Sequence, residues 1–414
     1  METTLAAPVK TTIWNRNFIC VFIANAMLSL THSAVNTLVS TYATYLGAGT
    51  LLMGLLTGLF FGVSLAMRPV TGPVSTKLDK RTLMIFVFAL GGVVNIGYAL
   101  FPHIGMFVFF RFFHGMQYSL VGSLIMTVAG DSLPREKLAS GMGIYTVGGT
   151  VMFAIAPSIG IGLLNLGTRL KDQGLGFELM FFFGAAASLL AVIPSLLLLP
   201  DKKTKAEIAS TGAWYKNILT VHAIPTAVVI TLVCAAYSLY NNYMVKFAAE
   251  KGIAGISIFF TVTAAFTFFS RPLSGRLAER FGIKKIMIPC LIVYAASFIV
   301  VGTSKGLASV LVGGALAAVG YGATQPSLQA MAIQTVTPLK RSVASNTLYA
   351  GIDLGFFVGP FLGSVVYKYS NYSVMYLTGI VPVALAIVCF LVFWPMYARR
   401  LKELRALEGD SGAA

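Results

Sequence analysis

Charged side chains are scarce in this sequence. Only 11% of its 414 residues are charged, and the 14 acidic residues are outnumbered by 30 lysines and arginines. An ordinary soluble domain carries roughly 25% charged residues. With 57% hydrophobic residues and a mean hydropathy of +0.82, most of the surface of this chain is unsuited to water. An ordinary soluble enzyme or soluble binding domain is therefore excluded.

Cysteine and nucleotide-binding or metal-binding motifs are also lacking. The four cysteines, Cys20, Cys234, Cys290 and Cys389, lie in apolar runs without CxxC spacing, which argues against a disulfide framework and a zinc site. There is no Gly-x-x-x-x-Gly-Lys-Ser/Thr phosphate loop and no HExxH motif. We therefore expect a protein that is not an enzyme or an ATP-driven pump, and that has no cofactor and no metal site.

Long apolar runs, in contrast, recur from one end of the chain to the other. Each has about the 20 residues that a helix needs to cross roughly 30 Å of hydrocarbon. The twelve runs cover residues 17–45, 51–76, 82–102, 104–130, 138–165, 177–199, 217–246, 254–278, 285–303, 306–333, 342–367 and 373–397. Open sheet edges cannot be satisfied in lipid, so every run should be a helix. The predicted fold class is an all-α integral membrane protein with twelve transmembrane helices.

The net charge of +16 could indicate a nucleic-acid partner, but the charges are distributed as in a membrane protein. If the chain starts inside, the outer segments hold only six of the 30 cationic residues: Arg169, Lys171, Lys246, Lys251, Lys305 and Lys368. The positive-inside rule then places both termini in the cytoplasm. We predict a multi-pass protein of the cytoplasmic membrane, surrounded by the lipid bilayer, with no nucleic-acid partner.

The second half of the sequence repeats the first. The segment RPVTG at Arg68–Gly72 recurs 203 residues later as RPLSG at Arg271–Gly275, and Tyr145 recurs 204 residues later as Tyr349. A same-orientation repeat of six spans implies two bundles related by a pseudo-two-fold axis along the membrane normal, with a site between them near the midplane.

A polar, cationic segment separates the two repeats. We predict an N-terminal six-helix bundle over residues 1–199, a cytoplasmic linker over 200–216, and a C-terminal six-helix bundle over 217–414 that ends in a short cytoplasmic tail.

Short motifs at matching places in the spans indicate a known family. The loop after the eighth span carries Gly275, Leu277, Ala278, Glu279, Arg280, Gly282, Lys284 and Lys285. The fourth span carries Arg111, Phe112, Phe113, His114 and Gly115. The fifth span has Ala156, Pro157 and Gly160, and the eleventh has the fuller Gly359, Pro360 and Gly363. On these residues the chain resembles the major facilitator superfamily, particularly its drug- and sugar-efflux-like proton antiporters.

The resemblance implies the twelve-helix fold of that superfamily, alternating access, and a small organic solute as the substrate. It also implies that Arg111 is a coupling arginine. The loop signature is incomplete in the first half, where Thr76 stands at the position of the family's acid.

Ionisable residues within the spans are the first candidates for function, because a charge at the bilayer centre is costly. Asp353 is the only acid placed deep in a span, and we predict that it binds the proton, with Arg271 as its partner by depth. The alternative is a permanent structural pair. Arg111 and His114 share one helix face and complete the predicted proton-coupling group; alternatively, Arg111 binds backbone carbonyls and His114 is a neutral core residue.

Polar residues in the spans that should line a cavity make up the predicted substrate site. They are His32, Asn36, Arg111, Gln117, Tyr118, Tyr145, Tyr237, Tyr240, Asn241, Gln325 and Gln329. Any one of them could instead form a helix–helix contact. Three arginines against one aspartate in the spans favour anionic or neutral solutes.

Glycines at four-residue intervals mark two helices, because such stripes allow close approach between backbones. They are Gly351, Gly355, Gly359 and Gly363 in the eleventh span, and Gly54, Gly58 and Gly62 in the second. In the superfamily these two helices face each other, which implies a sliding surface; static packing is the alternative. The predicted gating and interface residues are Arg68, Gly58, Gly62, Gly355, Gly359, Pro360, Glu279 and Arg280.

The leading functional prediction is a monomeric, proton-coupled exporter of a small organic solute. Uptake or exchange of an organic anion without proton coupling is the alternative, favoured by the arginines. A membrane-embedded enzyme would need paired catalytic groups, and the spans offer a single deep acid.

Overall fold

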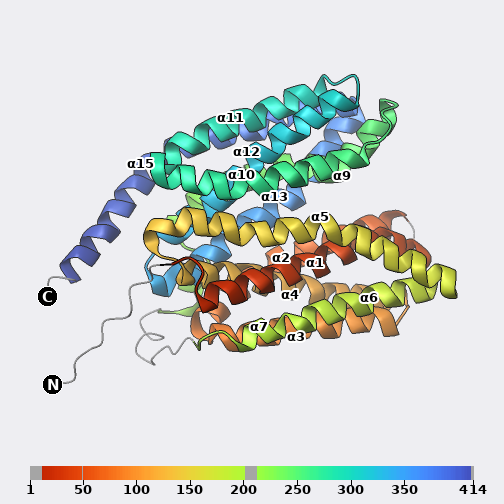
Figure 1. Cartoon of the computed structure of the whole chain (residues 1–414), viewed down its shortest axis with the longest axis horizontal. Helices are drawn as coiled ribbons and strands as arrows, with labels where there is room; N and C mark the ends of the chain where they lie inside the picture. The colour runs from red at the N-terminus through yellow and green to blue at the C-terminus, as the bar shows by residue number, and fades with distance from the viewer. Residues whose placement is uncertain (1–11, 49, 201–211, 412–414) are drawn as a thin grey trace.

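The computed structural model describes residues 12–48, 50–200 and 212–411, and over these ranges the chain is helical, with short turns and no strand (Figure 1). The first bundle contains α1 (Arg16–Tyr45), α2 (Thr50–Lys77), α3 (Lys80–Leu100), α4 (Ile104–Ser132), α5 (Leu138–Leu170), α6 (Gln173–Leu190) and α7 (Val192–Leu196). The second contains α9 (Ile224–Glu250), α10 (Ser257–Phe281), α11 (Ile283–Gly302), α12 (Leu307–Gln334), α13 (Arg341–Tyr369), α14 (Tyr372–Thr378) and α15 (Ile380–Ser411). The predicted all-α class is confirmed.

The number of membrane-crossing segments also agrees with the sequence. Within the described residues, nine segments are long and apolar enough to cross a membrane, with α6 and α7 forming one segment and α14 and α15 another. The helices α2, α4 and α10, of 28, 29 and 25 residues, bring the total to twelve. These three helices carry Arg68, Arg111 and Arg271.

Side-chain caps define where several of these helices begin. Asn15 and Asp79 accept hydrogen bonds from the backbone N–H groups of Phe18 and Thr82 at the starts of α1 and α3. Asp172 caps α6 in the same way. Such caps satisfy N–H groups that have no partner inside the helix. They fix the turns between spans, and thereby the register in which neighbouring spans pack.

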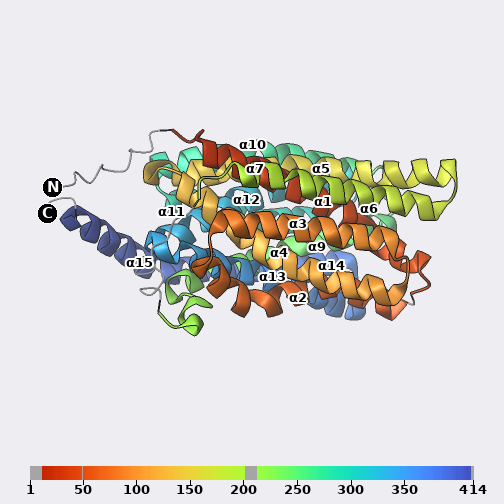
Figure 2. The same ribbon diagram turned by 90° about the horizontal axis from the view of Figure 1, so that it is seen from below.

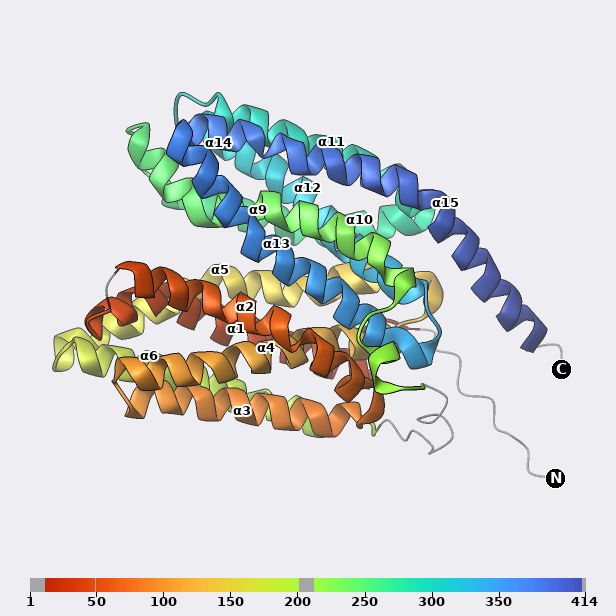
Figure 3. The same ribbon diagram turned by 180° about the vertical axis from the view of Figure 1, so that it is seen from behind.

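The two bundles lie side by side and diverge toward one end (Figures 1 and 3). We call the end where α1 begins and α15 ends the terminal end (Figure 2), and the other the opposite end. The bundles meet where α2, α4 and α5 contact α10, α12 and α13. Most of the predicted linker, residues 201–211, falls outside the described residues, and the bundle boundaries stay a prediction.

The glycine stripe of α13 packs differently from the prediction. A Cβ atom at Gly355 would lie 2.5 Å from the carbonyl oxygen of Thr231, and one at Gly359 2.4 Å from that of Ala235, both in α9 of the same bundle. The carbonyl of Pro360 likewise accepts a hydrogen bond from Tyr243 in α9, at 2.7 Å. The prediction of a sliding surface is therefore wrong for this stripe, which is packed within its own bundle.

The α2 stripe gives no support to a sliding surface either. A Cβ atom at Gly62 would meet no atom within 4 Å. The surroundings of Gly58 lie outside the described residues.

Candidate functional site

A buried ion pair joins α2 of the first bundle to α13 of the second. Arg68 donates to Asp353 Oδ2 through Nε at 2.9 Å and through Nη2 at 2.8 Å. Ser64, one turn before Arg68, donates to the same oxygen at 2.8 Å. The side chains of Arg68 and Asp353 are only 2% and 0% exposed. Both members of this link between the two bundles are therefore shielded from solvent.

The carboxylate of Asp353 uses only one of its oxygens in this link. Its Oδ1 is buried and has no hydrogen-bond partner among the described residues. A buried carboxylate with one vacant oxygen can accept a proton without first losing a hydrogen bond. The predicted depth of Asp353 is thus matched by its burial, but the predicted partner, Arg271, is wrong, because Arg68 of the other bundle takes that place.

Asn346 extends the α2–α13 contact toward the terminal end. Its Nδ2 donates to the carbonyl of Arg68 at 2.9 Å, and its Oδ1 accepts from Thr71 at 2.7 Å. Asn346 is fully buried and lies seven residues before Asp353, two turns along the same face of α13. The sequence analysis missed Asn346; its spacing from Asp353 was the available signal.

A second crossing, between α5 and α10, is built around Arg271. Its Nη1 donates to the carbonyl of Thr146 in α5 at 2.6 Å, and its Nη2 to Gln325 Oε1 in α12 at 2.7 Å. No acid contacts this guanidinium among the described residues, and Nε is buried without a partner. The backbones approach closely, because a Cβ at Gly143 would lie 2.5 Å from the carbonyl oxygen of Arg271.

A partly buried ion cluster lies at the terminal end of the contact that α2 and α4 make with α13, which we call the first crossing. Asp131, at the end of α4, binds Lys80 and Arg341 at 2.8 Å each, and Arg341 begins α13. Burial raises the pKa of Asp131, but the charges of Lys80 and Arg341 together outweigh burial and leave that pKa below its ordinary value. The sequence analysis missed Asp131 and Arg341, although Asp131 directly follows a predicted span.

At the terminal end, the second crossing is formed by a contact between a carboxylate and a backbone N–H group. Glu279 of α10 accepts a hydrogen bond at 2.7 Å from the backbone N–H of Ser140, in the first turn of α5. A carboxylate near a helix N-terminus is favourable because the orphan N–H groups and the helix dipole attract it. Glu279 thus lies at the interface as predicted. Arg280 is exposed, and its guanidinium lies 5.2 Å from the ring centre of the neighbouring Phe281; its predicted gating role stays a prediction.

A polar and aromatic cluster lies inside the first bundle around Arg111. The guanidinium donates to Asn36 Oδ1 at 2.6 Å and to the carbonyl of Leu56 at 3.2 Å, and it lies 4.8 Å from the ring centre of Phe60. The Asn36 amide contacts the His32 ring at 2.8 Å. Arg111 Nη1 is buried without a partner among the described residues. The structure thereby brings Arg111, Asn36 and His32 together.

Two further predicted residues border this cluster. The ring of Tyr118 stacks on His32 at 4.8 Å. His114 lies 3.3 Å from the hydroxyl of Tyr98 and is 97% buried, with its ring against Phe60.

Some predicted cavity residues lie within the bundles. Tyr240 is buried among aromatic rings of the second bundle and hydrogen-bonds to Ser297 at 2.9 Å. The amide of Gln117 points at Gly91 of α3. These two predictions are wrong, because hydropathy gives the depth of a residue but not the side of the helix on which it lies.

The remaining predicted cavity residues differ in their contacts and in their exposure. Tyr237 stacks on Tyr321 at 3.7 Å, Gln325 binds Arg271, and Asn241 is exposed. Tyr145 and Gln329 are buried, and Gln329 Oε1 has no partner in the described part of the chain.

All hydrogen bonds between the bundles lie from the middle of the spans to the terminal end. The outermost ring contact is Phe61 of α2 stacked on Phe356 of α13 at 5.6 Å. Beyond it, toward the opposite end, the described residues form no hydrogen bond from one bundle to the other. Within the described residues, the hydrogen bonds between the bundles therefore lie on the terminal-end side, and the buried carboxylate of Asp353 accepts some of them.

Comparisons with known proteins were made on the whole chain. A family model described as Major Facilitator Superfamily matches residues 21–254 and 226–410. Multidrug resistance protein MdtG of Escherichia fergusonii is 24% identical over 95% of this chain and 97% of its own length. Multidrug resistance protein 2 of Bacillus subtilis is 22% identical over 76% of this chain and 80% of its own length.

Solved structures share the fold. The human organic anion transporter MFSD10 (TETRAN) superposes with a TM-score of 0.73 at 16% identity, over 93% of this chain and 100% of its own. The E. coli fucose:proton symporter FucP gives a TM-score of 0.73 at 13% identity, over 90% and 97%.

Proposed function

Because this chain belongs to the major facilitator superfamily, and is therefore a multi-pass membrane transporter of small solutes rather than an enzyme, we propose that it exports an organic solute in exchange for protons. The observation that carries the proposal is Asp353, a fully buried carboxylate that links the two bundles through Arg68 and whose Oδ1 has no hydrogen-bond partner among the described residues.

Proton binding at Asp353 would weaken the link in which it takes part. In the charged state, the carboxylate compensates the buried guanidinium of Arg68. A proton removes that charge, and leaving a buried partner uncompensated costs about 3–5 kcal/mol. The protonated protein would therefore favour an arrangement in which α2 and α13 separate and Arg68 is hydrated. Alternation between the joined and the separated arrangement would move the access of the site from one end to the other.

The direction and the substrate class are inferred from relatives. Two relatives with long aligned regions are named multidrug resistance proteins, which favours export of a small organic compound. A multidrug exporter needs a site that tolerates several ligands, and the stacked rings of Tyr118 and His32 offer apolar surface beside polar groups.

Organic-anion transport without proton coupling is the second candidate function. Arg111 is buried and contacts no acid among the described residues, and its Nη1 lacks a partner. A carboxylate or sulfonate on a solute would satisfy that group. One protein with the same fold is titled an organic anion transporter, although at 16% identity this likeness extends only to the fold.

The cellular setting follows from the charge pattern. The scarcity of cationic residues in the segments of the opposite end supports a cytoplasmic membrane location with both termini in the cytoplasm. We propose that the monomer is the working unit, because one chain supplies both bundles and the site between them.

The proposed function is tested in liposomes with an imposed pH gradient and a trapped pH dye, using panels of cationic, neutral and anionic solutes. We expect solute-dependent proton flux that is abolished in Asp353→Asn, while solute counterflow persists because no net proton transfer is needed. Asp353→Glu, which keeps a carboxyl group, should retain part of the proton flux. Solute flux of an anion without any proton movement would instead establish the second candidate.

A further inference from the structure

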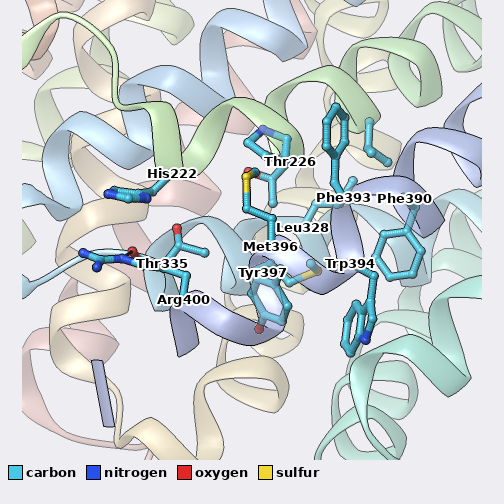
Figure 4. A pocket seen from close by; sticks show the side chains of 13 residues that line it. His222, Thr226, Leu328, Thr335, Phe390, Phe393, Trp394, Met396, Tyr397 and Arg400 are labelled. Carbon is cyan, nitrogen blue, oxygen red and sulfur yellow. Dashed lines mark hydrogen bonds between the residues drawn. The ribbon is translucent and has the colours of Figure 1, made fainter. Parts of the chain in front are cut away.

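A pocket outside the contact between the bundles opens on the second bundle near the terminal end (Figure 4). It lies between the start of α9, the end of α12 and the middle of α15. Its lining residues are His222, Pro225, Thr226, Val229, Leu328, Met331, Thr335, Phe390, Phe393, Trp394, Met396, Tyr397 and Arg400. None of the residues that link the two bundles takes part in it, so the pocket is separate from the transport site.

The wall of the pocket is almost entirely apolar, and its few polar residues lie at one side. Figure 4 shows His222, Thr335 and Arg400 at one side and the rings of Phe390, Phe393 and Trp394 at the other. Arg400 follows Phe390 by ten residues in α15, a rise of about 15 Å at 1.5 Å per residue. Because α15 runs toward the terminal end, the polar side faces the membrane surface and the aromatic side faces the bilayer interior.

Cations outnumber acids around this pocket. Arg400 is held by the carbonyl of Thr335 at 3.2 Å and by Glu403 at 3.1 Å, through Nε and Nη1. Its Nη2 forms no hydrogen bond with the described residues. On the other flank, the ammonium of Lys284 lies 5.8 Å from the ring centre of Trp394. The described groups at the pocket are thus one acid, Glu403, and three basic residues, Arg400, Lys284 and His222.

We propose that this pocket binds an anionic phospholipid of the surrounding bilayer. The phosphate would lie at Arg400 Nη2 and His222, and an acyl chain would lie along Met396 toward Phe390. This orientation matches that of a lipid in the leaflet at the terminal end, with its headgroup at the surface and its chain toward the midplane. Basic pockets between spans are suited to anionic headgroups because the leaflet supplies them at high local concentration.

The intrinsic fluorescence of Trp394 gives a direct test. The sequence has three tryptophans, and the other two, Trp14 and Trp214, are more than half exposed. A Trp14→Phe/Trp214→Phe protein reports on the pocket alone. In bilayers of zwitterionic lipid, titration with acyl-brominated phosphatidylglycerol should quench Trp394 at an about fivefold lower lipid fraction than brominated phosphatidylcholine.

Matched variants locate the binding group. Arg400→Gln should bring the ratio of the two half-quenching fractions close to one, whereas Arg399→Gln, at an exposed neighbour outside the pocket, should leave it unchanged. Glu403→Gln should increase the preference. A thermal unfolding curve of Arg400→Gln verifies that the protein is folded.

Two results would overturn the proposal. Equal quenching by the two lipids, with or without Arg400, would mean that the pocket does not select an anionic headgroup. A preference that persists in Arg400→Gln would mean that the headgroup does not bind at Arg400. The readout does not depend on transport, so failure here leaves the proposed function untouched, and failure of proton coupling leaves this site untouched.

Discussion

The two crossings between the bundles have repeated sequences but different chemistry. In the α2–α13 crossing, Arg68 meets the carboxylate of Asp353 at 2.8 Å. In the α5–α10 crossing, Arg271, the repeat of Arg68, donates to the backbone carbonyl of Thr146 at 2.6 Å. Since a carbonyl carries no ionisable proton, only the first contact can change charge.

The same contrast extends to the terminal end. There the first crossing has the ion pair of Asp131 and Arg341, and the second has Glu279 bound to the backbone N–H of Ser140. Both crossings include a hydrogen bond to backbone, because Asn346 donates to the carbonyl of Arg68, but among the described residues only the first crossing contains ion pairs between side chains of the two bundles. We infer that the α2–α13 crossing opens on protonation, while the α5–α10 crossing stays closed longer and guides the movement.

The largest effect is expected for Arg68→Ala, which leaves Asp353 buried as an unpaired charge. The cost of about 3–5 kcal/mol should strongly reduce the population of the joined arrangement. Distances between spin labels placed on the two bundles at the terminal end would measure this population. In Arg68→Ala/Asp353→Asn the joined arrangement should recover in large part, while proton coupling should not.

Gly143→Ala should break the second crossing, because the added Cβ would lie 2.5 Å from the carbonyl oxygen of Arg271 in α10. Overpacking of this kind costs about 1–3 kcal/mol. Transport rates should fall, whereas the number of protons moved per solute should stay as in the unmodified protein. Gly62→Ala is the matched control, since no atom lies within 4 Å of its Cβ position; an equal loss in both variants would contradict the prediction.

The ion cluster at the terminal end should make stability depend on pH. The pKa of Asp131 in the folded protein lies below its ordinary value, so its stabilising effect is fully present above that ordinary value and is lost as the pH falls through the lowered one. Thermal unfolding from neutral to acidic pH should therefore show a smaller decrease in Tm for Asp131→Asn than for the unmodified protein. Parallel curves would contradict this assignment.

Glu279→Gln should have the smallest effect, because the amide oxygen can still accept the hydrogen bond from Ser140. Only the charge at the helix N-terminus is lost, which is worth about 0.3–1 kcal/mol. Glu279→Ala removes the acceptor as well and should be clearly more destabilising in thermal unfolding. If the two variants were equally stable, the hydrogen bond would contribute nothing to the second crossing.

The fold could be predicted from sequence to a large extent, because bilayer thickness determines the length of each span. Asp353 could be singled out for the same reason, since an acid in a span is rare. Its partner could not, because Arg68 and Arg271 occupy equivalent repeat positions and the sequence does not say which helix face meets α13. The glycine stripe of Gly355 and Gly359 failed similarly: the period identifies a face for close packing without naming the neighbouring helix.

If Asp353 binds the proton as proposed, its Oδ1, which has no hydrogen-bond partner among the described residues, separates the speed of the proton step from the strength of the link. All three bonds from α2 end on Oδ2, so a proton that arrives at Oδ1 has no bond to displace. The barrier to its arrival is then the time that water needs to reach the carboxyl. A change that strengthens the ion pair would shift the equilibrium between the arrangements and leave the protonation rate nearly constant.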